Sequence, residues 1–273
     1  MNSIDSTSGA MAKPRRTRIV RIETSGGPRW GGVLGTTVRA LEGDPFWSWQ
    51  FGEELGELDG LTLLPPTVPT KIVCVGLNYA AHAEESDSAV PTEPLLFFKP
   101  PSAVIGPAAT IVLPGQSGRV DYEAEMAIVR AARCRDVTVE EAWSFAAGIT
   151  CGNDVTARDL QARDDQWTRA KGFDTFCPLG PWLLTGAAES DLADLGIECR
   201  VNGEVRQRGR TSDMIFSPAE LIAYVSSIMT LQPGDVIMTG TPEGVGPLSS
   251  GDVVEVDVDG VGTLWNPVED DDT

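Results

Sequence analysis

Two dipeptides that favour tight β-hairpins constrain the fold of this chain more than any other feature. Asn202-Gly203 lies within the apolar and polar alternation of residues 197–207, and Asp259-Gly260 lies within that of residues 253–265. Both dipeptides are typical of type I′ turns, which join neighbouring antiparallel strands. Many other short strand-like segments accompany few helical ones. The sequence therefore predicts an α+β fold, mainly β, with an antiparallel or mixed sheet and not a doubly wound parallel sheet.

Two helices have recognisable starts. Thr138-Val139-Glu140-Glu141 forms a capping box, in which side chains at both ends satisfy free backbone N–H groups. Ser217-Pro218-Ala219-Glu220 adds proline at the first helical position. A third, shorter helix is expected after the strand-like residues 72–75, beyond a turn that begins at Gly76.

The chain divides into three regions. Residues 1–17 are expected to be a flexible tail, and Ser8-Gly9-Ala10-Met11 within it is either a vector-derived remnant or an alternative start. Residues 18–66 predict a small β-rich N-terminal subdomain. The proline-rich residues 65–69 predict a stiff, extended linker. Residues 71–268 are expected to form the main domain.

Charge and cysteine content exclude several classes of function. With 40 Asp and Glu against 21 Lys and Arg, the formal net charge is −19. Surfaces for nucleic acid or anionic membranes need clustered cations and are therefore not expected. No apolar run is long enough for a signal peptide or a membrane span. The 5 cysteines are scattered, without a Cys-x-x-Cys pair. We expect a cytoplasmic protein that acts on small molecules.

Three acidic residues form the first candidate site. Glu123 and Glu125 alternate on a strand-like segment, so both should point to the same face. Ala127 and Val129 should share that face. Together with Asp154, the two glutamates could bind a hard divalent cation, which prefers oxygen ligands and would neutralise them. The alternative is a solvated strand face beside an aspartate that caps the next helix.

The single histidine, His82, precedes Glu85 by three positions, which places both side chains on one face of a helix. A glutamate bonded to one ring nitrogen fixes the tautomer and leaves the other nitrogen to accept a proton. The pair therefore fits a general base and its orienting group. The alternative is an exposed helix with an incidental histidine.

Arg158, Gln161 and Lys171 are candidates for substrate contacts. Arg158 and Gln161 are three residues apart, so a guanidinium fork and an amide could together bind a carboxylate and an oxo group. A surface arginine is the alternative. Lys171 lies among apolar residues and glycine and could stabilise an oxyanion. Its structural alternative is an ion pair with Asp174 or Asp165.

A glycine-rich turn, Thr239-Gly240-Thr241-Pro242-Glu243-Gly244-Val245-Gly246, follows the strand-like residues 236–238. It is not a nucleotide loop, because no Gly-Lys-Ser/Thr follows and the strand-to-helix context is missing. Its backbone N–H groups and the Thr241 hydroxyl could approach a small substrate. A tight structural turn is the alternative.

Taken in order, several motifs resemble those of the fumarylacetoacetate hydrolase family. The resemblance spans residues 71–268, and the preceding β-rich segment is similar to the N-terminal segment of bacterial members. Within the family, the chain looks closest to the isomerase/decarboxylase-type and acylpyruvate-hydrolase-type proteins. The motifs are Gly76-Leu77-Asn78-Tyr79 with His82 and Glu85, residues 94–100, Asp121-Tyr122-Glu123-Ala124-Glu125, residues 153–159 and residues 240–246.

The resemblance implies a mixed β-sandwich roll, usually a homodimer, with one Mg²⁺ or Mn²⁺ per chain. It implies that Glu123, Glu125 and Asp154 hold the metal. His82 and Glu85 match a water-activating dyad on a mobile lid, and Lys171 matches the active-site lysine.

The implied substrate-binding residues form a second group. At Leu77 the chain departs from the family pattern, because some relatives carry a basic residue there. This chain therefore lacks one possible anchor for a substrate carboxylate. The group consists of Arg158, Gln161, Gly240, Thr241 and Tyr79.

The resemblance leaves several activities open. The first expectation is metal-dependent hydrolysis of a C–C bond in a 2-oxo or 2,4-dioxo acid of the acylpyruvate or fumarylpyruvate type, through an enolate whose charge the metal stabilises. The second is isomerisation or decarboxylation, either in aromatic catabolism, as by 2-hydroxyhepta-2,4-diene-1,7-dioate isomerase and 5-oxopent-3-ene-1,2,5-tricarboxylate decarboxylase, or of oxaloacetate. A hypothesis from another class is a non-catalytic acidic cation-binding protein.

Overall fold

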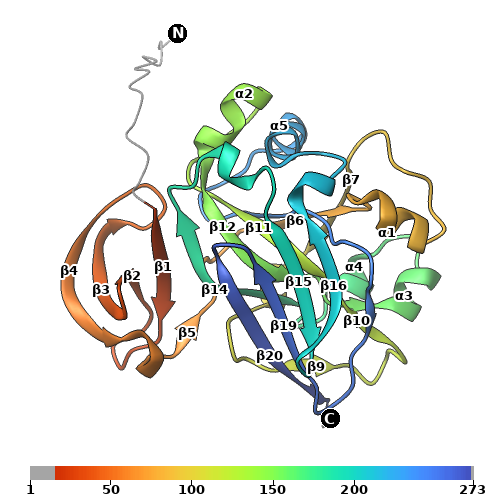
Figure 1. The fold of residues 1–273 in the computed structure, drawn as a ribbon, viewed down its shortest axis with the longest axis horizontal. Helices are drawn as coiled ribbons and strands as arrows, with labels where there is room; N and C mark the ends of the chain where they lie inside the picture. Colours follow the sequence, from red (N-terminus) through yellow and green to blue (C-terminus); the bar gives the residue numbers. More distant parts are fainter. Residues whose placement is uncertain (1–15, 272–273) are drawn as a thin grey trace.

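The computed structural model describes residues 16–271. Strands in open sheets are the main regular structure, and short helices lie at the margins (Figure 1). The tail predicted for residues 1–17 lies outside the described residues apart from Arg16 and Thr17, and Thr17 begins the first strand. The predicted mainly β, α+β class is confirmed.

The first layer is a long mixed sheet. Its strands are β1 (Thr17–Ile22), β2 (Arg29–Leu34), β3 (Thr37–Asp44), β4 (Ser48–Glu57), β5 (Leu63–Leu64), β6 (Ile72–Gly76), β7 (Leu95–Lys99), β8 (Val104–Ile105), β11 (Ala124–Arg130), β12 (Ala146–Asn153), β14 (Cys177–Thr185) and β17 (Val236–Met238). Their order is β4-β3-β2-β1-β14-β12-β11-β17-β6-β7, with β5 beside β1 and β8 beside β14. All neighbours are antiparallel except β17 with β6 and β8 with β14.

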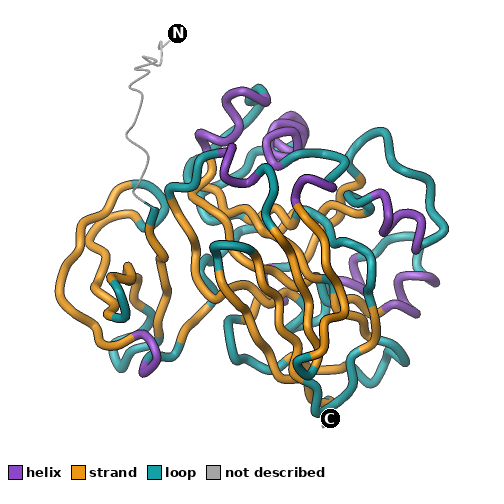
Figure 2. The backbone as a smooth tube through the Cα atoms, in the orientation of Figure 1, coloured by secondary structure: helices purple, strands orange, loops and turns teal. Residues whose placement is uncertain are grey.

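Two smaller sheets complete the β structure. Their strands are β9 (Ile111–Leu113), β10 (Val120–Tyr122), β13 (Thr156–Ala157), β15 (Gly196–Val201), β16 (Glu204–Arg210), β18 (Gly246–Pro247), β19 (Val253–Val258) and β20 (Gly262–Asp270). The sheet β16-β15-β19-β20-β9 lies across the long sheet, where β15, β19 and β20 contact β11, β12 and β14. The sheet β13-β10-β18 is separate. Figure 2 shows the strands stacked in this way.

Both predicted hairpins are present, but only one has the predicted turn. β15 and β16 are joined by Asn202 and Gly203, whose φ values of 54° and 78° fit a type I′ turn. β19 and β20 are joined by a longer loop, in which Gly260 has a φ of 75° but Asp259 lacks a positive φ. The type I′ prediction is wrong there, because the extra loop residue leaves only the glycine in the left-handed region.

The N-terminal β unit is continuous with the long sheet. Strands were expected from residue 18 to residue 41, and β1, β2 and β3 occupy that region. β1 also pairs with β14 of the main domain. The proline-rich residues 65–69 contain no strand or helix, as expected. Their buried Thr67 hydroxyl donates to the carbonyl oxygen of Gly234 at 2.6 Å, so this linker is packed against the main domain.

The α-helices are short and lie in two groups (Figure 1). Both predicted capping boxes are confirmed: Thr138 precedes α2 and Ser217 precedes α5. α2 and α5 contact each other at one end of the sheets, while α3 and α4 contact each other on the side where α1 lies. The helices are α1 (Ala80–Glu85), α2 (Val139–Ala142), α3 (Arg158–Arg163), α4 (Thr168–Lys171) and α5 (Pro218–Ile228).

Both faces of β11 are covered. Met126 and Ile128 belong to the hydrophobic core between the two layers, and Ala127 and Val129 belong to a second core on the opposite face. The predicted alternation along this segment is therefore confirmed, and every residue of β11 is buried. A carboxylate on this strand cannot face bulk water.

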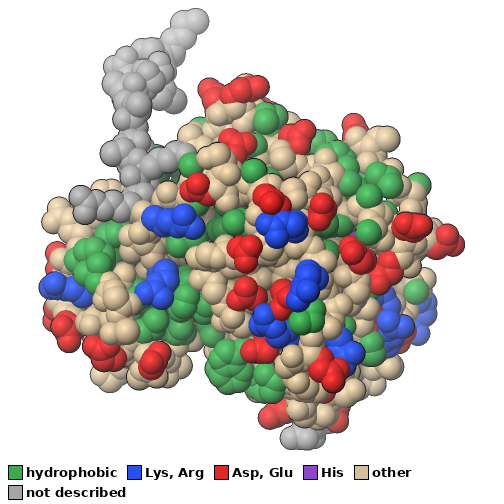
Figure 3. All heavy atoms as spheres, viewed as in Figure 1, with side chains coloured by type: hydrophobic (Ala, Val, Ile, Leu, Met, Phe, Trp, Pro, Cys, Tyr) green, Lys and Arg blue, Asp and Glu red, His purple; other side chains and the backbone are tan. Residues whose placement is uncertain are grey.

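The outer face of the β16-β15-β19-β20-β9 sheet carries neighbouring opposite charges (Figure 3). Glu198 accepts from Arg208 at 2.6 Å and also pairs with Arg200, and Arg206 pairs with Glu204 at 2.8 Å. Exposed pairs of this kind contribute only about 0–1 kcal/mol each. This face is a solvated outer surface, and the buried charges of the molecule lie elsewhere.

Candidate active site

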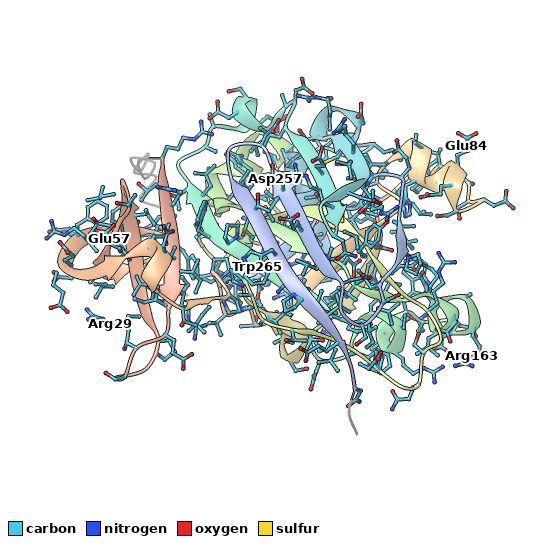
Figure 4. The ribbon with its side chains drawn as sticks, turned by 60° about the horizontal axis from the view of Figure 1, so that its bottom comes forward. Arg29, Glu57, Glu84, Arg163, Asp257 and Trp265 are labelled. Carbon is cyan, nitrogen blue, oxygen red and sulfur yellow. The ribbon has the colours of Figure 1, made fainter. Side chains whose placement is uncertain are left out.

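One cavity of about 480 Å³ brings most of the predicted site residues together. Residues of α1, α3 and α4 and of the loop after β17 contribute to its wall. Figure 4 labels Glu84 on α1 and Arg163 on α3, which lie on the same side of the molecule and point outward. The predicted residues that line the cavity are His82, Glu85, Glu123, Glu125, Asp154, Arg158, Gln161, Lys171 and Thr241.

The three acids meet where the β11–β12 ladder ends. Glu123 lies in the break between β10 and β11, and its N–H donates to the side-chain oxygen of Asn153 at 2.9 Å. The N–H of Asp154 donates to the carbonyl oxygen of Glu123 at 2.9 Å. One carboxylate oxygen from each of Glu123, Glu125 and Asp154 lies within 4.8 Å of the others. The antiparallel register thus places Asp154 beside Glu123, although they are far apart in sequence.

The alternative interpretations of these acids are wrong. Glu123 and Glu125 are only 4% and 1% exposed, so they do not form a solvated strand face. Asp154 does not cap α3, whose N-cap residue is Ala157. The reason is that both faces of β11 are covered and that a short strand, β13, separates Asp154 from the helix.

Lys171 and Arg158 compensate Glu123, and Lys171 also compensates Asp154. The Lys171 ammonium donates to Glu123 Oε2 and to Asp154 Oδ2, both at 2.8 Å. The Arg158 guanidinium donates to Glu123 Oε1 at 2.6 Å. Burial alone would raise the pKa of Glu123, but Lys171 and Arg158 outweigh it and hold that pKa below its ordinary value. Lys171 therefore does not pair with Asp174 or Asp165, the alternative that the sequence left open.

Glu125 lacks comparable compensation. Among the described residues, its carboxylate accepts one hydrogen bond, from the Gly240 N–H at 2.7 Å. Burial, reinforced by the carboxylates of Asp154 and Glu123, raises the pKa of Glu125 well above its ordinary value. Asp154 Oδ1 is buried and receives no hydrogen bond from the described residues. A buried group of three carboxylates, one of them with a single hydrogen bond, fits a divalent cation with oxygen ligands.

Lys99 lies beneath the acids. Its ammonium donates to the carbonyl oxygens of Val155 and Lys171 at 2.9 and 2.8 Å. It is also 2.7 Å from Asp154 Oδ1, as an ion pair without hydrogen-bond geometry. No local sequence signal indicates this role, because the three partners of Lys99 are distant in sequence.

Replacing Lys99 with methionine should destabilise the protein by about 3–5 kcal/mol, the cost of removing one partner of a buried ion pair. Chemical denaturation measures this change. Phe98→Met, on a half-exposed residue of the same strand, is the control and should change stability little. A loss for Lys99→Met no larger than that of the control would contradict the prediction.

His82 and Glu85 form the predicted pair. Nδ1 of His82 is 3.0 Å from Glu85 Oε2, and the other carboxylate oxygen accepts from the Gly244 N–H at 3.0 Å. An ionised glutamate can only accept, so Nδ1 carries the proton and Nε2 is the basic nitrogen. The glycine-rich loop thereby holds Glu85, and Glu85 holds the imidazole.

The side chains of Arg158 and Gln161, which the sequence predicted to bind a substrate, are hydrogen-bonded to each other. Arg158 Nη1 donates to Gln161 Oε1 at 2.7 Å, and its Nε donates to Asp121 Oδ2 at 2.9 Å. With Nη2 on Glu123, each guanidinium nitrogen already has a protein partner. The fork predicted to hold a substrate carboxylate therefore binds Asp121, Glu123 and the Gln161 side-chain oxygen, and the Gln161 amide nitrogen remains for a ligand.

The remaining predicted residues occupy different places. The Thr241 hydroxyl donates to the carbonyl oxygen of Ala124 at 2.8 Å and lines the cavity. Gly240 does not line the cavity, and its N–H supports Glu125. Tyr79 is 2% exposed within the hydrophobic core, where burial raises the pKa of its hydroxyl. The structure does not bring Tyr79 to the cavity, because its backbone bridges to Met214 and directs it inward.

Leu77 and Asn78 shape the turn before α1. Leu77 lines the cavity with a φ of 56°, a left-handed conformation that costs a non-glycine residue about 1–2 kcal/mol. The buried Asn78 side chain donates to the carbonyl oxygens of Thr239 and Phe216 at 2.8 and 3.0 Å. Asn78 thus ties this turn to the loop after β17 and holds Leu77 in place. Apart from its place in the motif, nothing in the sequence indicated this role for Asn78.

Comparison with known proteins assigns the chain to a family. Residues 71–269 match the family described as fumarylacetoacetate (FAA) hydrolase C-terminal. The chain belongs to the fumarylacetoacetate hydrolase family. Residues 17–66 match a second family, described as Rv2993c-like, N-terminal.

Members of this family resemble the chain over most of its length. Protein Rv2993c of Mycobacterium tuberculosis is 45% identical over 258 residues, which are 92% of this chain and 97% of that protein. Human mitochondrial oxaloacetate tautomerase FAHD2A is 46% identical over 215 residues, 76% of this chain and 68% of that protein. The crystal structure of 2-hydroxyhepta-2,4-diene-1,7-dioate isomerase from Mycobacterium marinum has 41% identity and a TM-score of 0.86, covering 93% of this chain and 100% of that one.

These similarities confirm the family and the fold that the sequence predicted. Enzymes of this family act on small molecules, and they commonly bind a divalent metal. The acid triad of Glu123, Glu125 and Asp154 is a group that could bind one. Within residues 16–271, no helix is long and apolar enough to cross a membrane.

Proposed function

We propose that this protein is a divalent-metal-dependent enzyme that transfers protons on a 2-oxo acid, by keto–enol tautomerisation or by moving a double bond next to the carbonyl. The observation that carries the proposal is a single cavity lined by both the His82–Glu85 pair and the three acids. The names of the human relative and the M. marinum neighbour, a tautomerase and an isomerase, favour proton transfer over bond cleavage.

The acid triad would hold Mg²⁺ or Mn²⁺. When bound, such a cation supplies Lewis-acid stabilisation of negative charge that develops on a substrate oxygen. Lys171 keeps Glu123 and Asp154 oriented, and uses two of its three N–H donors to do so. The third donor is therefore available for the substrate, which is the role expected of an oxyanion-stabilising lysine.

His82 would move the proton. Because Glu85 accepts from Nδ1, Nε2 can take a proton from the substrate carbon next to the carbonyl, and the Glu85 carboxylate stabilises the resulting imidazolium. Returning this proton to an oxygen or to a different carbon completes tautomerisation or isomerisation. No substrate fragment leaves.

C–C bond hydrolysis is the second candidate. The His82–Glu85 pair favours it as well, because an oriented imidazole can deprotonate a water molecule as readily as a carbon acid next to a carbonyl. Hydrolysis would release a second carboxylic acid, and decarboxylation would release CO₂, so the products distinguish the candidates.

Removal of metal should abolish activity, and readdition of Mg²⁺ or Mn²⁺ should restore it. The measurement follows ultraviolet absorbance of the enol forms of oxaloacetate, acetylpyruvate and fumarylpyruvate, with product analysis of each reaction. We expect conversion of the enol without a new acid. Release of acetate or fumarate would replace the proposal with hydrolysis, and equal rates after chelation would refute metal dependence.

A further inference from the structure

Arg119 lies on the wall of the same cavity and is not among the residues that the sequence singled out. Its side chain is 52% exposed. Its Nε and Nη2 donate to the two carboxylate oxygens of Asp121 at 2.8 and 3.1 Å, which fixes the plane of the guanidinium. Nη1 has no hydrogen-bond partner among residues 16–271. One edge of an oriented guanidinium is therefore free.

Arg119 is the outer end of a row of alternating charges. The row begins at Glu123, which accepts from Arg158 at 2.6 Å, and continues through Asp121, which accepts from both arginines. Its two carboxylates are buried, at 6% exposure for Glu123 and 0% for Asp121, whereas its two arginines become more exposed outward, from 23% for Arg158 to 52% for Arg119. The row thus leads from the buried acids toward solvent and ends in a positive charge.

The other two cations that line the cavity bind the protein's own carboxylates at its buried end. Lys171 is held by Glu123 and Asp154, and each nitrogen of Arg158 has a protein partner. Leu77, on the same wall, carries no charge. Among the described residues that line the cavity, Arg119 alone combines a fixed positive charge with an unused guanidinium edge.

We propose that Arg119 binds a second carboxylate at the far end of the substrate, so that the site selects 2-oxo dicarboxylates over 2-oxo monocarboxylates. This inference rests on the proposed function, which places the 2-oxo acid end at the three acids. A charge-assisted hydrogen bond from Nη1 provides the selectivity, because a neutral group at that position would gain no comparable interaction.

The test is calorimetric titration of the Mg²⁺-loaded protein with oxaloacetate, with 2-oxoglutarate and with the distal monomethyl ester of each. Arg119→Gln should weaken binding of the better diacid about 10- to 100-fold, the loss expected for a hydrogen bond to a charged group, and should change ester binding less than about twofold. The diacid affinity of Arg119→Lys should lie between those of the unaltered protein and Arg119→Gln, since lysine keeps the charge but not the oriented guanidinium edge.

Arg169→Gln is the matched control. Arg169 is 54% exposed, and its Nε and Nη2 bind the two oxygens of Asp164 as those of Arg119 bind Asp121, but it does not line the cavity. Its replacement should change neither the affinity for the diacids nor the affinity for their esters. Equal affinities for diacid and ester in the unaltered protein, or equal weakening of both by Arg119→Gln, would overturn the inference.

Turnover assays on the same samples separate this inference from the function on which it rests. Charge-selective binding without proton transfer would refute the proposed function and leave the role of Arg119 intact. Proton transfer with no preference for diacids would refute the role of Arg119 alone. Absence of binding by every ligand would refute both.

Discussion

Replacement of His82 with glutamine should lower kcat about 10²- to 10⁴-fold, the contribution of a positioned general base. Glutamine can still donate to Glu85 but cannot take up a proton at neutral pH. Metal affinity should remain unchanged, because His82 is not among the three grouped acids. Turnover of the enol substrate and calorimetric titration with Mg²⁺ measure the two effects separately.

A neighbouring glutamate provides the control for this experiment. Glu84 lies on the same helix, is exposed and points outward (Figure 4), so Glu84→Gln should retain full turnover. Lost turnover with intact metal binding in His82→Gln would exclude a non-catalytic cation-binding protein. Undiminished turnover would show that the pair is not the base.

Glu125→Gln and Asp154→Asn should change the stability of the metal-free protein in opposite directions. Glu125 is buried beside two like charges with one hydrogen bond, so a neutral amide removes repulsion and should raise Tm by a few degrees, equivalent to about 1 kcal/mol. Asp154 compensates both Lys99 and Lys171, and its loss leaves Lys99 buried without a carboxylate and Lys171 with Glu123 alone, which costs about 3–5 kcal/mol.

Thermal unfolding with and without Mg²⁺ tests both variants. The unaltered protein should gain stability from the metal by mass action. Both variants should lose most of that gain, because each removes one charged ligand. Asp257→Asn, on a residue of the outer sheet (Figure 4), is the control and should keep the gain in stability from Mg²⁺. A metal-dependent rise in Tm that persists in both variants would show that these acids do not bind the cation.

Local signals in the sequence predicted local structure well. The Asn202-Gly203 turn, the two capping boxes and the alternation along β11 depend on neighbouring residues, and all are present. The Asp259-Gly260 turn was predicted incorrectly, because loop length depends on how two strands pair. β4 was not identified, because its side chains are mostly half-buried or exposed and show no clear alternation.

Long-range contacts account for what the sequence could not predict about the site. Lys99, Asn78 and Arg119 acquire their roles from partners that are distant in the chain or, for Arg119, from the position of a cavity wall. Tyr79 shows the converse. It belongs to the site motif in sequence, yet its backbone bridges to Met214 and its ring lies in the core. Assignment to a motif therefore located the site but not the orientation of each member.

The pairing of β1 with β14 has a consequence for how the chain can be divided. Residues of β14 bond to β1 on one side and to β12 on the other, so backbone hydrogen bonds connect the N-terminal unit, through β12, to the strand that bears Glu125. Deletion of the N-terminal unit up to residue 66 would expose the edge of β14, including the buried Leu183 and Leu184. An unpaired strand edge of this kind is a template for aggregation. We therefore expect the N-terminal unit to protect the β14 edge of the long sheet and to be required for its stability.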